Sequence, residues 1–420
     1  MPLYYAQGSP DTVLAEDDLR AALAETFAQL GPRSRVALVP PDYSRYASGA
    51  GKLACLCCEL LGDAVTDVIP AVGTHEPMSA AQLDKMMPSV PRSLIRTHNW
   101  RTDVTTIGEV PGDVVAGLTE GIYEQPWPAQ LNTRLAAGEH DLIFSLGQVV
   151  PHEVIGMANY NKNLFVGVGG VRGINESHYI GAVYGMERVM GVADTPLRRI
   201  LNYAQDEFCG HLPLLYALTV IGANDAGQPV MRGLYIGDDH ECFWQAAALS
   251  AKVNVTQLPQ RLERVVVYLH PEKFSSTWLG NKAIYRTRMA IADGGELIVL
   301  APGVRTFGED ATIDQLIRKY GYRTTPEVLA AVAENADLQE NLSAPAHLIH
   351  GSSEGRFRIT YCPGKLSRQE VEGVGYEYGD LAEYTARFDP AKLADGLNTD
   401  QQGREFYFVR DPALGLWRCQ

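Results

Sequence analysis

The chain has 420 residues, 46% hydrophobic and 20% charged, which is typical of a globular protein long enough for two domains. Its 36 Lys and Arg against 50 Asp and Glu give a net charge of −14, and no basic stripe offsets it, so we expect neither nucleic acid nor a membrane as partner. The apolar runs are too short to span a bilayer and the N-terminus lacks a secretory pattern, so we expect a cytoplasmic protein.

The seven cysteines include three close neighbours, Cys55, Cys57 and Cys58. They lie in an apolar, helix-like stretch, and no second pair follows at the spacing of a zinc site. We therefore expect reduced and mostly buried thiols rather than disulfides or metal ligands.

The first part of the chain alternates predicted helices with short buried strands. Leu14, Leu19 and Leu23 recur at helical spacing and predict an amphipathic helix over 12–30. This alternation predicts an α/β domain whose parallel sheet is covered by helices. The further expected helices are 52–61 and 79–87, and the expected strands lie within 35–42, 67–77, 141–153 and 163–170.

Polar residues follow three of these strands. Asp42, Ser44 and Arg45 come after the first, His75 after the second and His152 after the third. Ligands of parallel α/β sheets bind outside the carboxyl ends of the strands, so these three loops predict one common site.

The stretch 149–178 carries further groups suited to a cofactor. Histidine can ligate a metal or move a proton near neutral pH, and a lysine beside glycine-rich backbone can hold a phosphate or form a covalent link. The glycines miss the dinucleotide fingerprint because Gly173 comes one place late, so we do not expect NAD. The residues concerned are His152, Lys162, His178, Gly167, Gly169, Gly170 and Gly173.

The remaining chain predicts a second, smaller α/β domain. We expect domains at 1–258 and 259–385, and a C-terminal segment, 386–420, that could return to the first domain. Lys282 and Arg286 are four apart on an expected helix, with Arg288 following, which suggests an anion site. The expected strands are 264–271, 296–303, 347–353, 356–362 and 404–412, and the expected helices are 275–295, 312–320 and 326–334.

Each candidate also has an ordinary structural interpretation. A loop histidine can cap a helix, a lysine can simply be solvated, and Asp42 can form a local ion pair with Arg45. The basic residues near Lys282 can form a solvated face.

The order and spacing of these residues resemble the nickel-pincer lactate racemase family. The resemblance rests on His152 and Gly156, on Lys162 ten residues after His152, and on His178 twenty-six after it. It extends to the Asp42–Ser44–Arg45 motif, to Gly73–Thr74–His75, and to Lys282 twelve residues before the Gly294–Gly295 pair.

This resemblance implies two α/β domains with parallel or mixed sheets, and an active site in the cleft between them. The implied cofactor is a nickel ion held by a thiolated pyridinium mononucleotide, attached covalently at Lys162 and ligated by His178, and supplied by cofactor-biosynthesis enzymes. His75 and His152 would be the acid/base pair. Asp42, Ser44, Gly156, Gly169 and Gly170 would bind the cofactor, whereas Arg45, Lys282, Trp278 and Arg286 would bind substrate.

The implied activity is racemisation or epimerisation of a small anionic 2-hydroxy acid. Trp278 and Leu279 stand where lactate racemases tend to have Tyr-Gln, and Asn159, Tyr160 and Asn161 replace glycines before Lys162, which favours a larger, more polar substrate such as a sugar acid. Two other functions stay open, a dehydrogenase or hydrolase on the same fold without the cofactor, and a non-catalytic sugar-acid binder. Activity that survives Lys162→Ala would indicate the former, and binding that survives loss of both His75 and His152 the latter. The oligomeric state also stays open, a homo-oligomer included.

Overall fold

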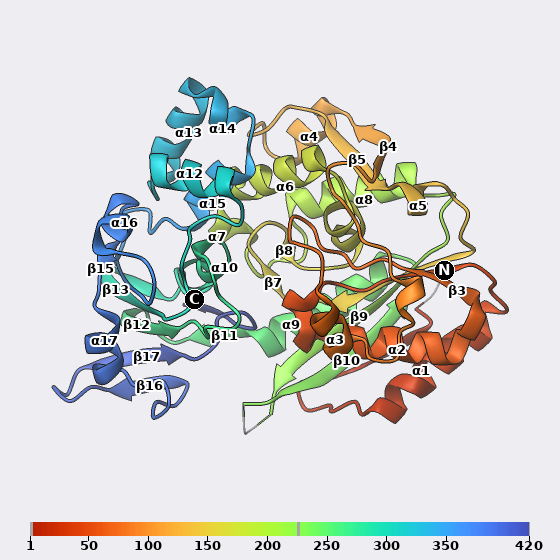
Figure 1. Ribbon diagram of the computed structural model, residues 1–420, viewed down its shortest axis with the longest axis horizontal. Helices are drawn as coiled ribbons and strands as arrows, with labels where there is room; N and C mark the ends of the chain where they lie inside the picture. The colour runs from red at the N-terminus through yellow and green to blue at the C-terminus, as the bar shows by residue number, and fades with distance from the viewer. Residues whose placement is uncertain (1–2, 225–226, 420) are drawn as a thin grey trace. The chain divides into compact units, whose positions relative to one another are not determined.

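The computed structural model describes residues 3–224 and 227–419, which form two compact units (Figure 1). The first contains the chain up to Ile180 together with Val189–Asn254, and the second contains Gly181–Arg188 and the chain from Val255 on. The division falls before the boundary expected after residue 258. The segment 386–420 does not return to the first unit, because its strands pair within the second.

The first unit is built on a six-stranded mixed sheet in the order β1-β10-β9-β6-β2-β3. The pairs β2–β3, β2–β6 and β6–β9 are parallel, whereas β9–β10 and β10–β1 are antiparallel. The α/β fold with a parallel or mixed, helix-covered sheet is thus confirmed. The strands are β1 Tyr5–Gly8, β2 Val36–Val39, β3 Val65–Val68, β6 Leu142–Gln148, β9 Leu214–Ala223 and β10 Pro229–Gly237.

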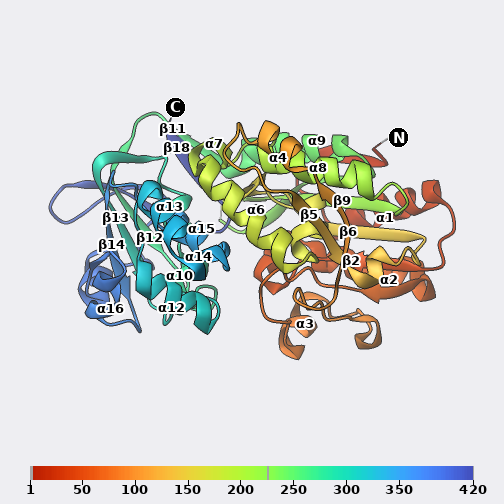
Figure 2. The ribbon, with the colours of Figure 1, turned by 90° about the horizontal axis from the view of Figure 1, so that it is seen from above.

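Side chains alternate across this sheet, as the period of a strand requires. Val36 and Leu38 pack with α1 and α2 on one face, whereas Ala37 and Val39 pack with α8 and α9 on the other. Figure 2 shows α8 and α9 on the opposite side of these strands from α2. The helices are α1 Glu16–Leu30, α2 Ala50–Leu61, α8 Pro196–Phe208 and α9 His240–Asn254.

All three expected helices of this unit form close to the predicted places, with α2 starting at Ala50 rather than residue 52. α1 begins at Glu16 rather than near residue 12, and its first turn carries three acidic residues that favour a helix start. α3 (Ala80–Met86) begins after Ser79, whose hydroxyl accepts a hydrogen bond from the backbone N–H of Gln82 in a capping box.

The strand expected within 163–170 is wrong. Asn163–Gly167 forms a π-helical turn, followed by α6 (Val171–Tyr184). The side-chain amide of Asn163 donates to the Val39 carbonyl at the end of β2 and to the Ser145 hydroxyl in the middle of β6, which holds this turn across the two strands. The rest of the unit consists of α4 Gly112–Leu118, α5 Thr133–Ala136, the paired strands β4 Val104–Val110 and β5 Trp127–Asn132, and the 3-10 helices Tyr43–Ser48, Gly62–Ala64 and Arg92–Leu94.

The second unit contains a six-stranded sheet in the order β15-β14-β13-β12-β17-β16. All its pairs are parallel except β16–β17. The strands are β12 Leu262–Tyr268, β13 Ile291–Ala301, β14 Arg358–Pro363, β15 Glu377–Tyr378, β16 Gly396–Thr399 and β17 Glu405–Val409, with a separate parallel pair of β11 Val255–Leu258 and β18 Leu416–Cys419.

Two expectations for this unit are wrong. The segment 275–295 is not one helix, because only two short helical turns form before β13 starts at Ile291. The segment 347–353 is not a strand, because it begins within α15, whose side chains are buried on every side and so lack a readable period. The helices are α7 Met186–Val189, α10 Thr277–Gly280, α11 Lys282–Tyr285, α12 Ala311–Tyr320, α13 Thr325–Glu334, α14 Ala336–Gln339, α15 Ser343–His350, α16 Arg368–Gly373 and α17 Leu381–Arg387.

All seven cysteines are free thiols, and Cys55 and Cys57 are buried in α2. Burial raises the pKa of Cys58 to about 11, so this thiol is protonated and unreactive at neutral pH. A search of the described residues finds no helix long and apolar enough to cross a membrane.

Candidate active site in the first unit

The three loops expected to converge follow three adjacent strands. β2 lies between β6 and β3 and is parallel to both, so the carboxyl ends of all three strands lie at one edge of the sheet. A further bridge between Pro41 and Ala71 continues the β2–β3 pairing into the loops. The amide of Gly73 donates to the Gly167 carbonyl, 2.8 Å away, which ties the His75 loop to the glycine-rich turn.

Asp42 and His75 form an ion-pair contact across two of these loops. Nδ1 of His75 lies 2.7 Å from Oδ2 of Asp42, and the Ser44 hydroxyl donates to Oδ1 at 2.5 Å. Burial works to raise the pKa of Asp42, but His75, Ser44 and Arg45 together hold it below its ordinary value. The carboxylate is thus ionised and accepts the Nδ1 proton, which places the lone pair of a neutral His75 on Nε2.

His152 lies in a small hairpin formed by β7 (Pro151–His152) and β8 (Gly156–Met157). Its Nδ1 accepts the backbone N–H of Val154 at 3.1 Å, so the neutral ring carries its proton on Nε2. The Glu153 carboxylate is 3.6 Å from the same Nδ1. The two histidines therefore favour opposite tautomers.

Lys162 follows this hairpin and is half-buried, with its amine surrounded by charged groups. Burial, together with Arg45 and Arg198, lowers its pKa to about 8, against the opposing effect of Glu153 and Asp42. These contributions come from the loop of Asp42 and Arg45, from Glu153 beside His152, and from Arg198 on α8. The amine is neutral in an appreciable fraction of molecules near pH 7 to 8, and such an amine is a nucleophile.

His178 lies on α6, close to Lys162. Its Nδ1–H donates to the Ile174 carbonyl at 2.7 Å, which leaves the lone pair on Nε2. Burial lowers the pKa of His178 to about 4, and Lys162 contributes in the same direction. The imidazole is therefore neutral at physiological pH, with one nitrogen held by a backbone carbonyl, as in most histidines that ligate metals.

The glycines before α6 are required by close packing. A Cβ on Gly169 would lie 1.9 Å from the Phe165 carbonyl oxygen, and one on Gly170 would lie 2.5 Å from Oε1 of Gln130. His98 Nε2 donates to the Gly169 carbonyl at 3.0 Å, since its Nδ1 accepts from the Asn132 amide. This closely packed turn brings backbone without side chains to the start of a helix, which suits an anionic group.

Gly156 has a structural explanation that needs no cofactor. Its φ is +85°, and an added Cβ would lie 1.9 Å from the Val192 carbonyl oxygen. Its expected part in cofactor binding stays a prediction.

The three expected substrate-binding residues of the second unit lie in different surroundings. Lys282 is half-buried, and its amine lies 3.5 Å from the Leu279 carbonyl. Arg286 is buried and donates to the Gly415 carbonyl, whereas the Trp278 ring lies against His347. Lys282 and Arg286 lie one helical turn apart, because the Arg286 backbone N–H donates to the Lys282 carbonyl at 3.1 Å, although the longer helix expected around them is absent. Substrate binding by these three residues stays a prediction.

The donor set of the first unit fits a metal only if other donors complete it. Within residues 3–224 and 227–419, no group of three or more His, Cys, Asp or Glu side chains could hold a metal ion. One neutral histidine beside a nucleophilic lysine suits a metal whose remaining donors belong to an organic cofactor linked to that lysine.

Two residues of the site were not expected from the sequence. Glu153 acts on both Lys162 and His178, and its position next to His152 was the available signal. His98 supports the glycine turn from a distant loop, and nothing in the sequence around it indicates this role.

Comparison with known proteins supports the lactate racemase resemblance. Residues 18–190 match the family model described as the lactate racemase N-terminal domain. No curated protein matches the chain.

Two solved structures share the fold. A protein from Thermotoga maritima superposes with a TM-score of 0.81 at 22% identity, covering 99% of this chain and 100% of that one. The lactate racemase apoprotein from Thermoanaerobacterium thermosaccharolyticum superposes with a TM-score of 0.72 at 14% identity, covering 97% of this chain and 94% of that one. Residues 18–190 are thus similar to the lactate racemase N-terminal domain, and the chain shares its fold with both solved structures.

Proposed function

We propose that this protein is a racemase or epimerase of a 2-hydroxy acid that uses a nickel-pincer nucleotide. The family match supports a racemase-type isomerase in general terms, and the finer assignment rests on the residues of the first unit. The observation that carries it is the pairing of Lys162, a half-buried lysine whose amine has a lowered pKa, with His178, a neutral imidazole whose lone pair is on Nε2.

Lys162 would form the covalent link to the cofactor and His178 would provide the protein ligand of the nickel. The turn at Gly169 and Gly170 would receive the phosphate, because backbone amides at a helix start favour an anion. When bound, this cofactor would supply a cationic ring that accepts the hydride from C2 of the substrate and afterwards returns it.

The protein's own part is proton transfer and orientation. His75, with its Nδ1–H directed to Asp42, would take the hydroxyl proton of one enantiomer on Nε2. His152 carries its proton on Nε2 and would donate it when the hydroxyl of the other enantiomer is restored. Conversion of one enantiomer would thus begin with His75 as the base and His152 as the acid. Conversion of the other enantiomer would require His152 to be the base and His75 to be the acid.

Arg45 would bind the substrate carboxylate, because a guanidinium matches a carboxylate in geometry and charge. Fixing that end would leave only the C2 substituents to reorient. A larger, polar hydroxy acid is the substrate class favoured by the departures at Trp278 and Leu279.

The test is to co-express the protein with cofactor-biosynthesis enzymes, then measure bound nickel and the optical rotation of a panel of 2-hydroxy acids. We expect nickel near one equivalent of protein and loss of rotation with at least one acid. His152→Ala should abolish turnover but leave the covalent adduct at Lys162. Turnover that survives Lys162→Ala would refute the proposal.

A further inference from the structure

The segment before Lys162 has a costly backbone conformation. Asn159 and Tyr160 have φ values of +64° and +59°, and no other two consecutive non-glycine residues of the described chain share a positive φ. Residues with a Cβ avoid this region, and glycine normally occupies it. Some other part of the molecule must therefore stabilise this turn.

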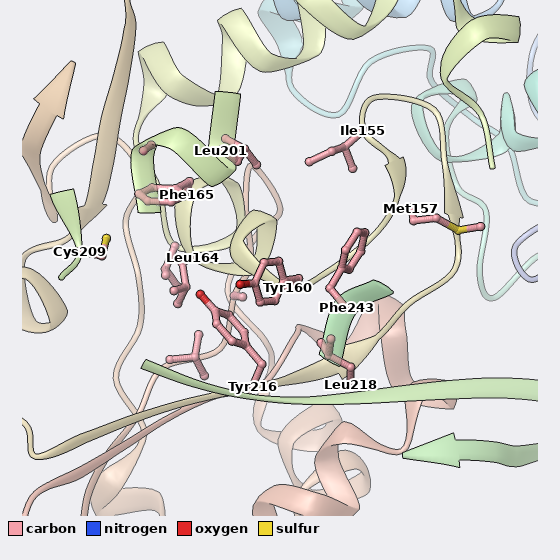
Figure 3. Packing of buried hydrophobic residues seen from close by; sticks show 14 of the residues in the cluster. Ile155, Met157, Tyr160, Leu164, Phe165, Leu201, Cys209, Tyr216, Leu218 and Phe243 are labelled. Atoms are coloured by element: carbon pink, nitrogen blue, oxygen red, sulfur yellow. The ribbon is translucent and has the colours of Figure 1, made fainter. Parts of the chain in front are cut away.

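The Asn159 side chain supplies part of the stabilisation locally. Its Oδ1 accepts the backbone N–H of Tyr160 at 2.7 Å, a bond that favours the left-handed conformation. The Tyr160 ring packs between Tyr216 and Phe243, as Figure 3 shows, with ring centroids 4.2 and 5.5 Å away.

The larger part comes from one face of α8. Arg198, Asn202 and Gln205 are spaced at i, i+4 and i+7 and so lie along the same side of the helix. Asn202 accepts from the Asn161 amide at 2.8 Å, and Gln205 donates to the Tyr160 hydroxyl at 2.8 Å.

Arg198 makes the most contacts to the turn. Its guanidinium donates to the carbonyls of Met157 at 2.8 Å and Asn159 at 3.1 Å, and also to the Asn161 side chain. It is fully buried and lies 4.1 Å from the Phe243 ring centroid.

The charge of Arg198 is not neutralised by a salt bridge. Its contacts within the described part of the chain are carbonyl and amide oxygens and aromatic rings, without a carboxylate. Burial lowers the pKa of Arg198 to about 9, which is still above neutral, so the group stays cationic. A buried cation is expensive, and a hydrophobic side chain would fill the same space at lower cost. The hydrogen bonds of its guanidinium all go to residues 157–161, so this charge is used to hold that segment.

We propose that Arg198, supported by Asn202 and Gln205, is the positioning residue for Lys162: it holds the left-handed Asn159–Tyr160 turn that directs this lysine into the site. The inference rests on the proposed function only in taking Lys162 as the point of cofactor attachment. In this chain a face of α8 does what glycines would do elsewhere, at the cost of burying a charge.

The test compares Arg198→Met with Arg199→Met in the full chain. Arg199 is the adjacent residue on the same helix, but it is exposed and pairs with Asp194, so it controls for loss of an arginine from α8. The first measurement is hydrogen–deuterium exchange of peptides covering 157–163, made without cofactor.

We expect the backbone amides of residues 157–163 to exchange about tenfold faster or more in Arg198→Met, which is the factor for one lost hydrogen bond to a charged group. Exchange in β6 and α9 should be unchanged. Arg199→Met should match the wild type. Unchanged exchange at 157–163, or acceleration spread evenly over the unit, would overturn the proposal.

The second measurement is the yield of covalent adduct at Lys162 by mass spectrometry after co-expression with the cofactor enzymes. We expect a yield about tenfold lower in folded Arg198→Met and a normal yield in Arg199→Met. A local rise in exchange with an undiminished adduct yield would overturn the positioning role.

Asn202→Ala keeps the buried cation and serves if Arg198→Met does not fold. Asn202→Ala should show a smaller rise in exchange in the same segment. Arg198→Lys keeps the charge but loses the planar set of donors, so its exchange should lie between the wild type and Arg198→Met. If the wild type itself takes no adduct, the proposed function fails, and the exchange measurement alone then decides whether α8 holds the turn.

Discussion

Asp42→Asn should separate the two roles open to this carboxylate, orientation of His75 and contact with the cofactor. The structure favours orientation, since Oδ2 of Asp42 is 2.7 Å from Nδ1 of His75 and the Asp42 side chain is only 10% exposed. Asparagine keeps the shape but removes the charge that stabilises a protonated His75, and its amide can also donate to Nδ1 and so favour the wrong tautomer.

The magnitude follows from the bond that is lost. A hydrogen bond to a charged group contributes about 1.5–3 kcal/mol, which corresponds to roughly 10- to 100-fold in rate when it acts in the transition state. We expect kcat to fall by this factor while KM changes little, because the carboxylate acts on proton transfer rather than on substrate binding.

The assay is the interconversion of the enantiomers of an active 2-hydroxy acid, with the adduct at Lys162 quantified in the same sample. Asp67→Asn is the matched control. Asp67 also pairs with a buried histidine, with its Oδ2 3.0 Å from Nε2 of His140, but it lies within β3 and away from the three loops.

Asp67→Asn should reduce thermal stability and leave kcat per loaded protein unchanged. The reasoning would be refuted if Asp42→Asn kept more than half of wild-type kcat. A loss of adduct without a loss of kcat per loaded molecule would instead assign Asp42 to cofactor binding.

The other predictions concern the lysine, the metal ligand and the glycine turn. Because the pKa of Lys162 is lowered to about 8, acylation of Lys162 followed by mass spectrometry should level off above about pH 9, whereas an ordinary lysine becomes more reactive up to about pH 10–11. A profile that kept rising to about pH 10–11, as for an ordinary lysine, would contradict the lowered pKa. His178→Ala should retain the adduct but lose nickel on desalting, as metal analysis would detect; full nickel retention would exclude His178 as ligand. Gly169→Ala should lower the free energy of unfolding by about 1–3 kcal/mol through collision with the Phe165 carbonyl, whereas Gly117→Ala, with open space around it in a helix, should be neutral or stabilising in urea titrations.

Much of the site could be inferred from residue type and spacing. Asp42, His75 and His152 each follow an apolar run that reads as a buried strand, and parallel strands deliver their following loops to one edge of the sheet. The family resemblance then connected Lys162 and His178 with these loops. Such signals are local, or depend on fixed spacing, and so they can be read from a linear sequence.

The sequence was misleading where the deciding contacts are distant. Residues 163–170 resemble a strand in composition, but the Asn163 amide finds partners on β2 and β6 that a local pattern cannot reveal. The helix expected over 275–295 was interrupted because Ile291 onward pairs with β12, a long-range interaction that outweighs local propensity.

Arg198 is the clearest case of a role that only folding creates. In the sequence it is one arginine of an Arg-Arg pair on an amphipathic helix, where a solvated surface position is the ordinary expectation. Tertiary packing buries it against Phe243 and directs its donors to carbonyls about forty residues earlier in the chain. Residue types and spacing therefore identified the chemical groups, whereas packing between distant segments set their tautomers, charges and positions, because those depend on neighbours that the chain order does not specify.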